Sequence, residues 1–488
     1  MSRHLFTVAL LTAGLTVYAQ APEGIRAAKV VAAAADGTPD VAVAAYAVDA
    51  ERADLRSAAS AFVPQLTGDA SAGRTSTPLA SAQRASGASA LDESFQTYRL
   101  GIQRSYRNGV TLTPSVQMTR THLAEFGALV ETSAGLEVRY PLLGGASRSV
   151  PRASEISAQL RVDAAELDLE FARERSIANG LSAYWTYVGA RRTLDESLNA
   201  EERARQLRDE IQRLVDAGER PAADVGGVSA DLARRTADRL GSEQALYEAR
   251  LRLALAMGQP SEAAAQIGSP LDPLPTVPDT VDVDEPALIE RALANRYDLQ
   301  AATARLQAAD RVLGALVVDA RPSADAVVDI GYVGLAEGAA SPHQFVPLGI
   351  GTARGGRIEF SLKFNRLGGS GPAAAAARQR AARDQARVRL HDLARQIEAD
   401  VVSAVAETRS RAAEVHVLRA SVEAYDRAVF NERRRLQLGI GTLFDTQNAE
   451  ERLATASALA VAAEVRYAQA LIRLRLAVGA TAQSPVQN

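Results

Sequence analysis

The sequence predicts an α+β fold in which very long helices and shorter sets of strands occur in two internal copies. Two triplets of turn-forming residues share the same intervals, 67 and then 40 residues: Pro151, Gly218 and Gly258, and Pro372, Gly439 and Gly479. Fixed spacing over such distances is typical of a repeated architecture. A helix that fills the 67-residue interval would be about 100 Å long, whereas the average helix has about 11–12 residues.

Each copy is expected to contain one long helix, a turn and a returning helix. Pro151 and Pro372 suit the first position of a helix, because proline presets φ and needs no donor there, and no proline interrupts either 67-residue interval. Apolar residues recur at spacings of three and four within both intervals: Ile177, Leu181, Tyr184 and Val188, then Leu418, Val422, Tyr425 and Val429. Such stripes indicate helices that pack against neighbours. Gly218 and Gly439 are the expected turns.

The composition excludes several classes of function. The formal net charge is -3, which indicates neither a nucleic-acid partner nor an anionic membrane surface. The chain has no cysteine, so disulfides, thiol catalysis and a cysteine-linked lipid anchor are all excluded.

Residues 1–19 are predicted to be a signal peptide. Arg3 and His4 precede an apolar run, and the cleavage pattern ends at Ala19. The alternative is a membrane anchor, but the run is short for a span.

The remaining chain divides around the two copies. Residues 20–38 are expected to be a flexible leader, 39–258 the first copy, 259–284 a Pro- and Asp-rich connector, 285–479 the second copy and 480–488 a polar tail. Each copy is expected to begin with a helix that leads into its strands, over residues 39–62 and 285–320.

The residues between these helices and the long helices alternate with period two. The even positions 110, 112, 116 and 118 are apolar and alternate with polar residues, and the even positions within 136–142 and 358–364 do the same. Residues 100–102 and 328–332 indicate further strands. Asn108-Gly109 is a strong hairpin signal. Alternation fits both a soluble sandwich and a membrane barrel. The long stretches 74–94, 121–132 and 335–355, rich in small and polar residues, read as loops and favour the barrel.

The chain resembles the TolC-like family of outer-membrane efflux proteins. The resemblance rests on Gly439-Ile-Gly-Thr-Leu-Phe-Asp445 through Gly479, the parallel Gly218–Gly258 stretch, Tyr184-Trp185 and the Tyr140–Gly145 stretch. It implies a homotrimer whose strands form one transmembrane β-barrel in outer-membrane lipid and whose coiled helices form a periplasmic α-helical barrel. It also implies a periplasmic adaptor protein and an inner-membrane pump as partners, and about two strands per copy, whereas up to four are indicated in the first copy here.

The resemblance also implies a gate at the periplasmic end of the helices. Asp445 and Asn448 match the two acidic gate positions, so one of the two charges is missing. Asp224 matches the acidic partner of a latch, whose tyrosine and arginine positions hold Leu436 and Gly441 here. Arg434 or Arg435 could substitute. The alternative role for Asp224 and Asp445 is to cap a helix N-terminus after a turn.

No residue pattern indicates an enzyme, a cofactor or a metal site. The five histidines lack metal-ligand spacing, and Gly349-Ile-Gly351 lacks the strand–helix context of a nucleotide loop. The expected function is therefore an exit duct for efflux or type I secretion, a passive conduit across periplasm and outer membrane. The alternative is a secreted coiled-coil structural or adhesin-like protein.

Overall fold

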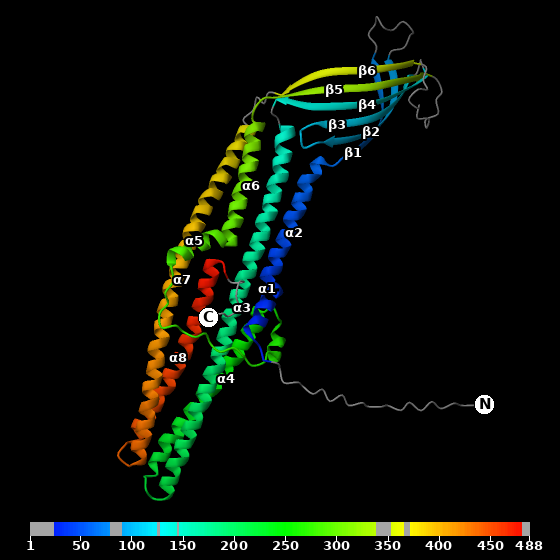
Figure 1. Cartoon of the computed structure of the whole chain (residues 1–488). Coiled ribbons are helices and arrows are strands. Elements are labelled where there is room, and N and C mark those ends of the chain that lie inside the picture. Colours follow the sequence, from blue (N-terminus) through cyan, green and yellow to red (C-terminus); the bar gives the residue numbers. More distant parts are fainter. Residues whose placement is uncertain are drawn as a thin grey trace, which may run out of the picture. The chain divides into compact units, whose positions relative to one another are not determined.

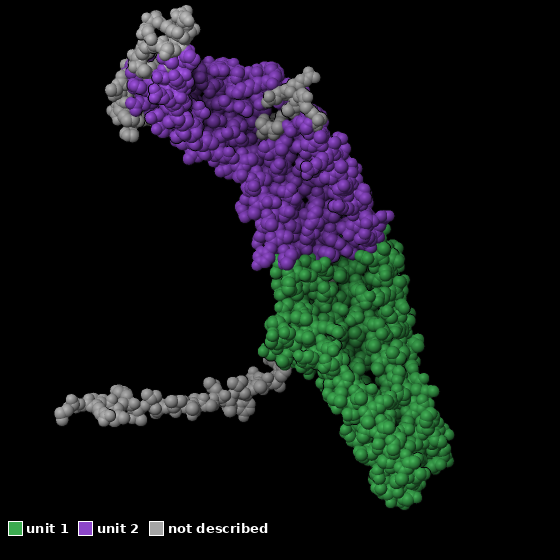
Figure 2. All heavy atoms as spheres, turned by 180° about the vertical axis from the view of Figure 1, so that it is seen from behind, with its two compact units in different colours: residues 1–42, 172–295, 398–488 green, residues 43–171, 296–397 purple. Residues whose placement is uncertain are grey.

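The computed structural model describes residues 24–78, 90–123, 127–143, 146–337, 353–365 and 371–480. These residues form two compact units (Figure 2). Of the described residues, those within 24–42, 172–295 and 398–480 form unit 1, and those within 43–171 and 296–397 form unit 2. The signal peptide and the polar tail from 481 onward lie outside the described residues.

The element order alternates helices with two sets of strands (Figure 1). The helices are α1 Ala27–Gly37, α2 Pro39–Ala59, α3 Ala146–Asp216, α4 Ala223–Ala256, α5 Glu285–Asn295, α6 Tyr297–Asp319, α7 Gly371–Gln437 and α8 Leu443–Val478, with short 3-10 turns at Ser60–Phe62 and Ser261–Gln266. The strands are β1 Gln65–Pro78, β2 Ala90–Ser105, β3 Thr111–Leu123, β4 Gly127–Leu143, β5 Ser323–Glu337 and β6 Ala353–Asn365.

Unit 2 is built around one antiparallel sheet in the order β1-β2-β3-β4-β5-β6. The four strands that follow α2 therefore lie in the same sheet as the two strands that follow α6. Asn108-Gly109 forms the turn between β2 and β3, where Gly109 has φ 90° and Asn108 Oδ1 accepts a hydrogen bond from the Val110 backbone N–H (3.1 Å).

The strands are longer than the alternation predicted. Residues 74–78 and 90–94, expected in a loop, belong to β1 and β2, where Ser76 lies opposite Asp92. Residues 121–123 and 127–132 likewise belong to β3 and β4, and the ends of 335–355 belong to β5 and β6. These stretches contain few large apolar residues, so their sequence carries no period-two signal although the backbone ladder continues.

Unit 1 is a helical body whose core contains α1, α3, α4 and α8. Tyr184 and Trp185 of α3 lie in this core in an edge-to-face arrangement, with ring centroids 5.2 Å apart. The Tyr184 hydroxyl donates to Asp272 Oδ2 (2.8 Å) in the segment after α4. Burial and this carboxylate raise the pKa of Tyr184. Ile267 and Leu274 from the same segment are buried in the core, so the connector packs against the helices.

The leader prediction is wrong for residues 27–37, which form α1. Ala27, Val30 and Ala34 repeat at helical spacing and are buried in unit 1. The alanine-rich composition hid this stripe. Gly37-Thr38-Pro39 then ends α1 and begins α2, as expected for proline at a first helical position.

Two helix boundaries also differ from the prediction. The expected helix over residues 285–320 is interrupted at Arg296, an extended residue with ψ 121°, and no glycine or proline marks the interruption. The first long helix begins at Ala146, so Pro151 lies inside its second turn. A proline so near the start removes only one early backbone hydrogen bond. Pro372 is the second residue of α7, close to its predicted position.

Candidate functional site: the helix turns of unit 1 and the apolar face of the sheet

The two turns that join α3 to α4 and α7 to α8 are both built on a glycine. Gly218 has φ 78° and Gly439 has φ 75°, a left-handed conformation that favours glycine. After α3, the Glu219 N–H donates to Leu214 O (2.9 Å), and after α7 the Ile440 N–H donates to Arg435 O (3.1 Å). These bonds satisfy the last carbonyl groups of each helix.

Asp445 lies in the first turn of α8 and takes part in its N-terminal cap. The Asp445 backbone N–H donates to Thr442 Oγ1 (3.1 Å), and the Thr442 hydroxyl donates to Asp445 Oδ2 (2.7 Å). Asp445 and Asn448 are both exposed. The structure therefore makes Thr442 the N-cap of α8, with Asp445 as its hydrogen-bond partner, and leaves the Asp445 carboxylate accessible to solvent.

Within one chain, the residues proposed for the latch have other partners. Asp224 forms an ion pair with Arg220 of its own turn (3.2 Å), and Arg435 forms one with Glu432 one turn earlier in α7 (2.8 Å). Arg434 is exposed. The described residues thus do not bring Asp224 together with Arg434 or Arg435.

Leu436 and Gly441 have structural roles in place of the latch side chains. Leu436 is buried against Leu207, Ile211 and Val228, in a cluster that joins α7 to α3 and α4. A Cβ at position 441 would lie 2.9 Å from the Leu436 backbone nitrogen. The turn therefore has no room for a side chain at position 441 unless its backbone moves.

Two buried glutamates on α8 each bind arginines from two other helices. Glu464 accepts hydrogen bonds from Arg192 of α3 (2.6 Å) and Arg419 of α7 (2.8 Å). Fourteen residues earlier, Glu450 binds Arg203 of α3 (3.0 Å) and lies 2.5 Å from Arg433 of α7. These clusters join α3, α7 and α8. The sequence pattern did not reveal these clusters, although glutamate on an otherwise alanine-rich stripe of α8 was an available signal.

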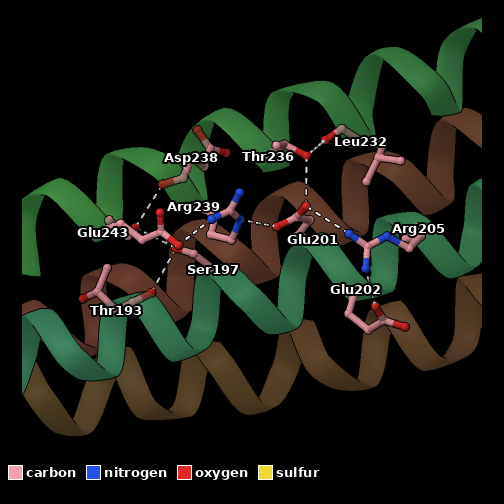
Figure 3. A network of polar contacts seen from close by, with 11 residues as sticks. Thr193, Ser197, Glu201, Glu202, Arg205, Leu232, Thr236, Asp238, Arg239 and Glu243 are labelled. Carbon is pink, nitrogen blue, oxygen red and sulfur yellow. Dashed lines mark hydrogen bonds and ion pairs between the residues drawn. The ribbon is translucent and has the colours of Figure 1, made fainter. Parts of the chain in front are cut away.

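A third buried carboxylate joins α3 to α4 (Figure 3). Glu201 accepts hydrogen bonds from Arg205 (3.2 Å) on its own helix and from Thr236 (3.1 Å) and Arg239 (2.6 Å) on α4. Arg239 also donates to Glu243 (2.5 Å), its neighbour along α4. Helices α3 and α4, which are connected by the first turn, are thus also joined by a continuous polar network.

The sheet of unit 2 has one apolar face that is exposed to solvent. Residues directly opposite on paired strands share a face, and the rows Leu136–Ile330–Ile358 and Val138–Val328–Phe360 cross three strands. On β6, the side chains of Ile358, Phe360, Leu362 and Phe364 are 51–77 % exposed. The other face carries charged and polar residues, such as Asp329 paired with Arg357 (2.7 Å). In the described residues the large side chains of β6 on this face are uncovered, whereas Val130 and Thr132 of β4 and Ala324 of β5 on the same face are buried.

Neither a metal site nor a helical membrane span is found in the part of the chain that the structure describes. No group of His, Cys, Asp and Glu there could hold a metal ion. No described helix is long and apolar enough to cross a membrane.

Sequence comparisons give no match, whereas structural comparisons do. No family model and no curated protein matches the chain. The outer-membrane channel OprN is 20% identical, with TM-score 0.69 over 93% of this chain and 89% of that one. Campylobacter jejuni CmeC, an outer-membrane channel, is 15% identical, with TM-score 0.68 over 93% and 86%. The Neisseria gonorrhoeae MtrE channel in its open state is 17% identical, with TM-score 0.65 over 93% and 89%. The chain therefore shares the fold of these outer-membrane channels.

Proposed function

We propose that this protein is the outer-membrane channel of an efflux or type I secretion system. In this proposal three copies assemble, the sheets close a barrel in the outer membrane, and the helices line a duct in the periplasm. The channel is a passive conduit without enzymatic activity, and a periplasmic adaptor and an inner-membrane pump supply the cargo. The repeated element order, in which helices, strands, a long helix and a returning helix occur twice, supports two internal copies.

The exposed apolar face of the sheet carries this proposal. A soluble protein rarely leaves a continuous patch of large apolar side chains in water. The alternative function, a secreted coiled-coil protein, does not account for such a patch on a β-sheet. On β5 the face runs from Ala324, which is buried, to Tyr332, nine residues whose ends are about 27 Å apart along the strand. With a strand tilt of about 40° the apolar band is about 21 Å tall, close to the roughly 25 Å band of outer-membrane barrels.

The open edges of the sheet support assembly. Six strands in one chain leave β1 and β6 each with a single partner. Unpaired backbone groups are not tolerated in lipid, because each one costs several kcal/mol. Other copies of the chain would remove these edges.

A pair of arginine substitutions tests the membrane assignment. Phe360 lies on the apolar face, and the next residue, Ser361, lies on the polar face. In a barrel, Phe360→Arg would place a charge against lipid at a cost of about 2–4 kcal/mol, whereas Ser361→Arg would enter the aqueous lumen. We expect the first variant to lose heat-sensitive trimers from outer-membrane extracts and the second to keep them. Soluble monomers of the unmodified protein in the periplasm would overturn the proposed function.

We also propose that Asp445, with Asn448, forms the gate at the periplasmic end. Three exposed Asp445 carboxylates around a threefold axis would attract divalent cations, so these ions should block conductance. Asp445→Ala should weaken the block and leave the trimer intact. Thr442→Ala is the matched control, since it removes the same side-chain hydrogen bond between Thr442 and Asp445 but keeps the charge. Equal block in the wild type and in Asp445→Ala would remove the gate assignment.

The latch is proposed to act between neighbouring chains of the trimer. Asp224 is held by Arg220 within its own turn, but Arg434 is exposed and available to a neighbouring copy. Arg434→Ala should then raise the open probability in bilayer recordings, and Arg435→Ala, which breaks only the local pair with Glu432, should not. Identical open probabilities in the two variants would leave no latch at this position.

A further inference from the structure

The number of strands in the sheet has a consequence for the size of the channel. The six strands that the structure describes belong to one continuous sheet, in sequence order, with β1 at one edge and β6 at the other. The diameter of a barrel built from such chains depends on whether the β2–β3 hairpin is part of the barrel wall and on whether the edge strands β1 and β6 pair with other chains.

The β2–β3 hairpin is an integral part of this sheet. β2 pairs with β3 from Glu93 to Ser105, and β3 pairs with β4 from Thr111 to Leu123. The apolar face continues across the hairpin, because Leu100 lies opposite Val116. The hairpin therefore takes up its own share of a barrel wall.

The turn of this hairpin is fixed to the helices of unit 2. Arg107 donates two hydrogen bonds to Glu155 of α3 (2.8 and 2.5 Å), and its guanidinium lies 4.9 Å from the centre of the Phe62 ring. The Arg107 bonds lower the pKa of Glu155, so the pair stays charged at neutral pH. This anchoring holds the hairpin at the base of the sheet and opposes its folding away from the wall.

The two free edges match each other in length and in the division of their faces. β1 has 14 residues and β6 has 13. Even-numbered residues of both strands lie on the apolar face, as the registers with β2 and β5 show. Small residues occupy this face of β1, at Gly68, Ala70 and Ala72, whereas β6 presents bulky Phe360 and Leu362.

The polar faces of the two edges carry opposite charges at matching positions. Asp69 lies on the polar face of β1 and Lys363 on the polar face of β6. Suppose that β6 of one chain pairs antiparallel with β1 of another, with even-numbered residues opposite even-numbered residues and the strand ends aligned. The side chains of Asp69 and Lys363 are then either directly opposite each other or diagonal neighbours. Both arrangements are within reach of a lysine side chain.

We infer that β6 of one copy pairs with β1 of the next, so that three copies close an eighteen-stranded barrel. This inference rests on the trimer of the proposed function and adds its strand number and width. With strands about 4.8 Å apart and tilted by about 40°, eighteen strands give a backbone diameter of about 36 Å, and twelve give about 24 Å. Barrels of sixteen to eighteen strands leave an open aqueous lumen.

Cysteine cross-linking tests the seam. The chain has no cysteine of its own, and a Cβ at Gly68 meets only an ordinary contact at 3.6 Å. Gly68→Cys is combined in one chain with Phe360→Cys, Leu362→Cys or Phe364→Cys, and oxidised membranes are analysed without reductant. We expect one of these three pairs to give covalent dimers and trimers, while Gly68→Cys with Lys363→Cys, on opposite faces, gives none.

The pattern of cross-links separates this inference from the proposed function. Cross-links confined to one chain would mean that the six strands close on themselves, and they would overturn the inference. Heat-sensitive trimers with conductance but without any of the three cross-links would also overturn it and leave the channel function standing. Loss of the trimers in the unmodified protein would instead remove the function on which the inference rests.

The width is measured independently by electron microscopy of detergent-solubilised trimers. Removal of residues 90–123 deletes β2 and β3 with their turn and leaves four strands per chain. The end-on barrel diameter should fall by about 12 Å, from eighteen to twelve strands. If that variant does not assemble, the diameter of the intact trimer decides: about 36 Å supports eighteen strands, and about 24 Å refutes them.

Discussion

Substitution of Glu464 by glutamine should destabilise unit 1 more than any substitution at an exposed ion pair. The Glu464 side chain is 7 % exposed and accepts from Arg192 on one side and from Arg419 on the other. Glutamine keeps the shape and one acceptor oxygen but loses the charge and one of the two arginine partners.

The magnitude follows from the exposure of the arginines. A hydrogen bond to a charged group contributes about 1.5–3 kcal/mol, and breaking a fully buried ion pair costs about 3–5 kcal/mol. Arg192 and Arg419 are 51 % and 43 % exposed, so water can solvate them when the carboxylate is gone. We therefore expect Glu464→Gln to lower the free energy of unfolding by about 2 kcal/mol, below the fully buried range.

The single tryptophan provides the assay. Trp185 is buried in the core of unit 1, so its fluorescence during denaturation of the full chain in detergent reports on this unit. Glu248→Gln is the matched control, because Glu248 and Arg252 form an i,i+4 pair on the same unit with both side chains at least half exposed. Glu248→Gln should lower the free energy of unfolding by less than about 0.5 kcal/mol. Equal costs for the two variants would refute the view that the buried clusters hold unit 1 together.

Two further predictions concern the turn and the pH dependence of unit 1. Gly439→Ala should lower the free energy of unfolding by about 1–2 kcal/mol, because φ 75° is unfavourable for a residue with a Cβ. Gly226→Ala in α4, where a Cβ would meet open space, should raise it by up to about 1 kcal/mol. Denaturation of both variants checks this pair of predictions. Hydrogen bonds and charge from Arg411 and Arg466 lower the pKa of Glu414, so its stabilising contribution is complete above its unfolded pKa of 4.5 and is lost as the pH falls through the lower folded value. Glu414→Gln should remove that part of the acid dependence, and an unchanged pH profile would contradict the assignment.

The sequence predicted the features that depend on local chemistry. Gly218 and Gly439 occur where the helices reverse, because a left-handed residue after a helix favours glycine over any residue with a side chain. Asn108-Gly109 marked the hairpin for the same reason. Period-two apolar positions such as Val328 and Ile330 located strands of the sheet, whose pairing and extent then came from the structure.

The sequence could not predict contacts that depend on distant partners. Arg192 and Glu464 are 272 positions apart, and each alone looks like an ordinary charged residue of a helix surface. The strand ends rich in serine and threonine gave no signal, because their stability comes from backbone pairing. The role of Asp445 needed both kinds of information: capping could be read from its place after the turn, whereas a gate depends on other copies of the chain.

The buried glutamates explain how alanine-rich helices can keep one register. Alanine faces are nearly alike at every turn, so packing alone discriminates weakly against a slip of one heptad. Glu450 and Glu464 are two heptads apart on α8, each with its own arginine from α3 and from α7. A slip of seven residues would leave Ser457 or a leucine opposite these arginines and would separate both carboxylates from their partners. Loss of these half-exposed to buried ion pairs would destabilise the slipped arrangement. The charges therefore supply the register specificity that the small apolar residues lack.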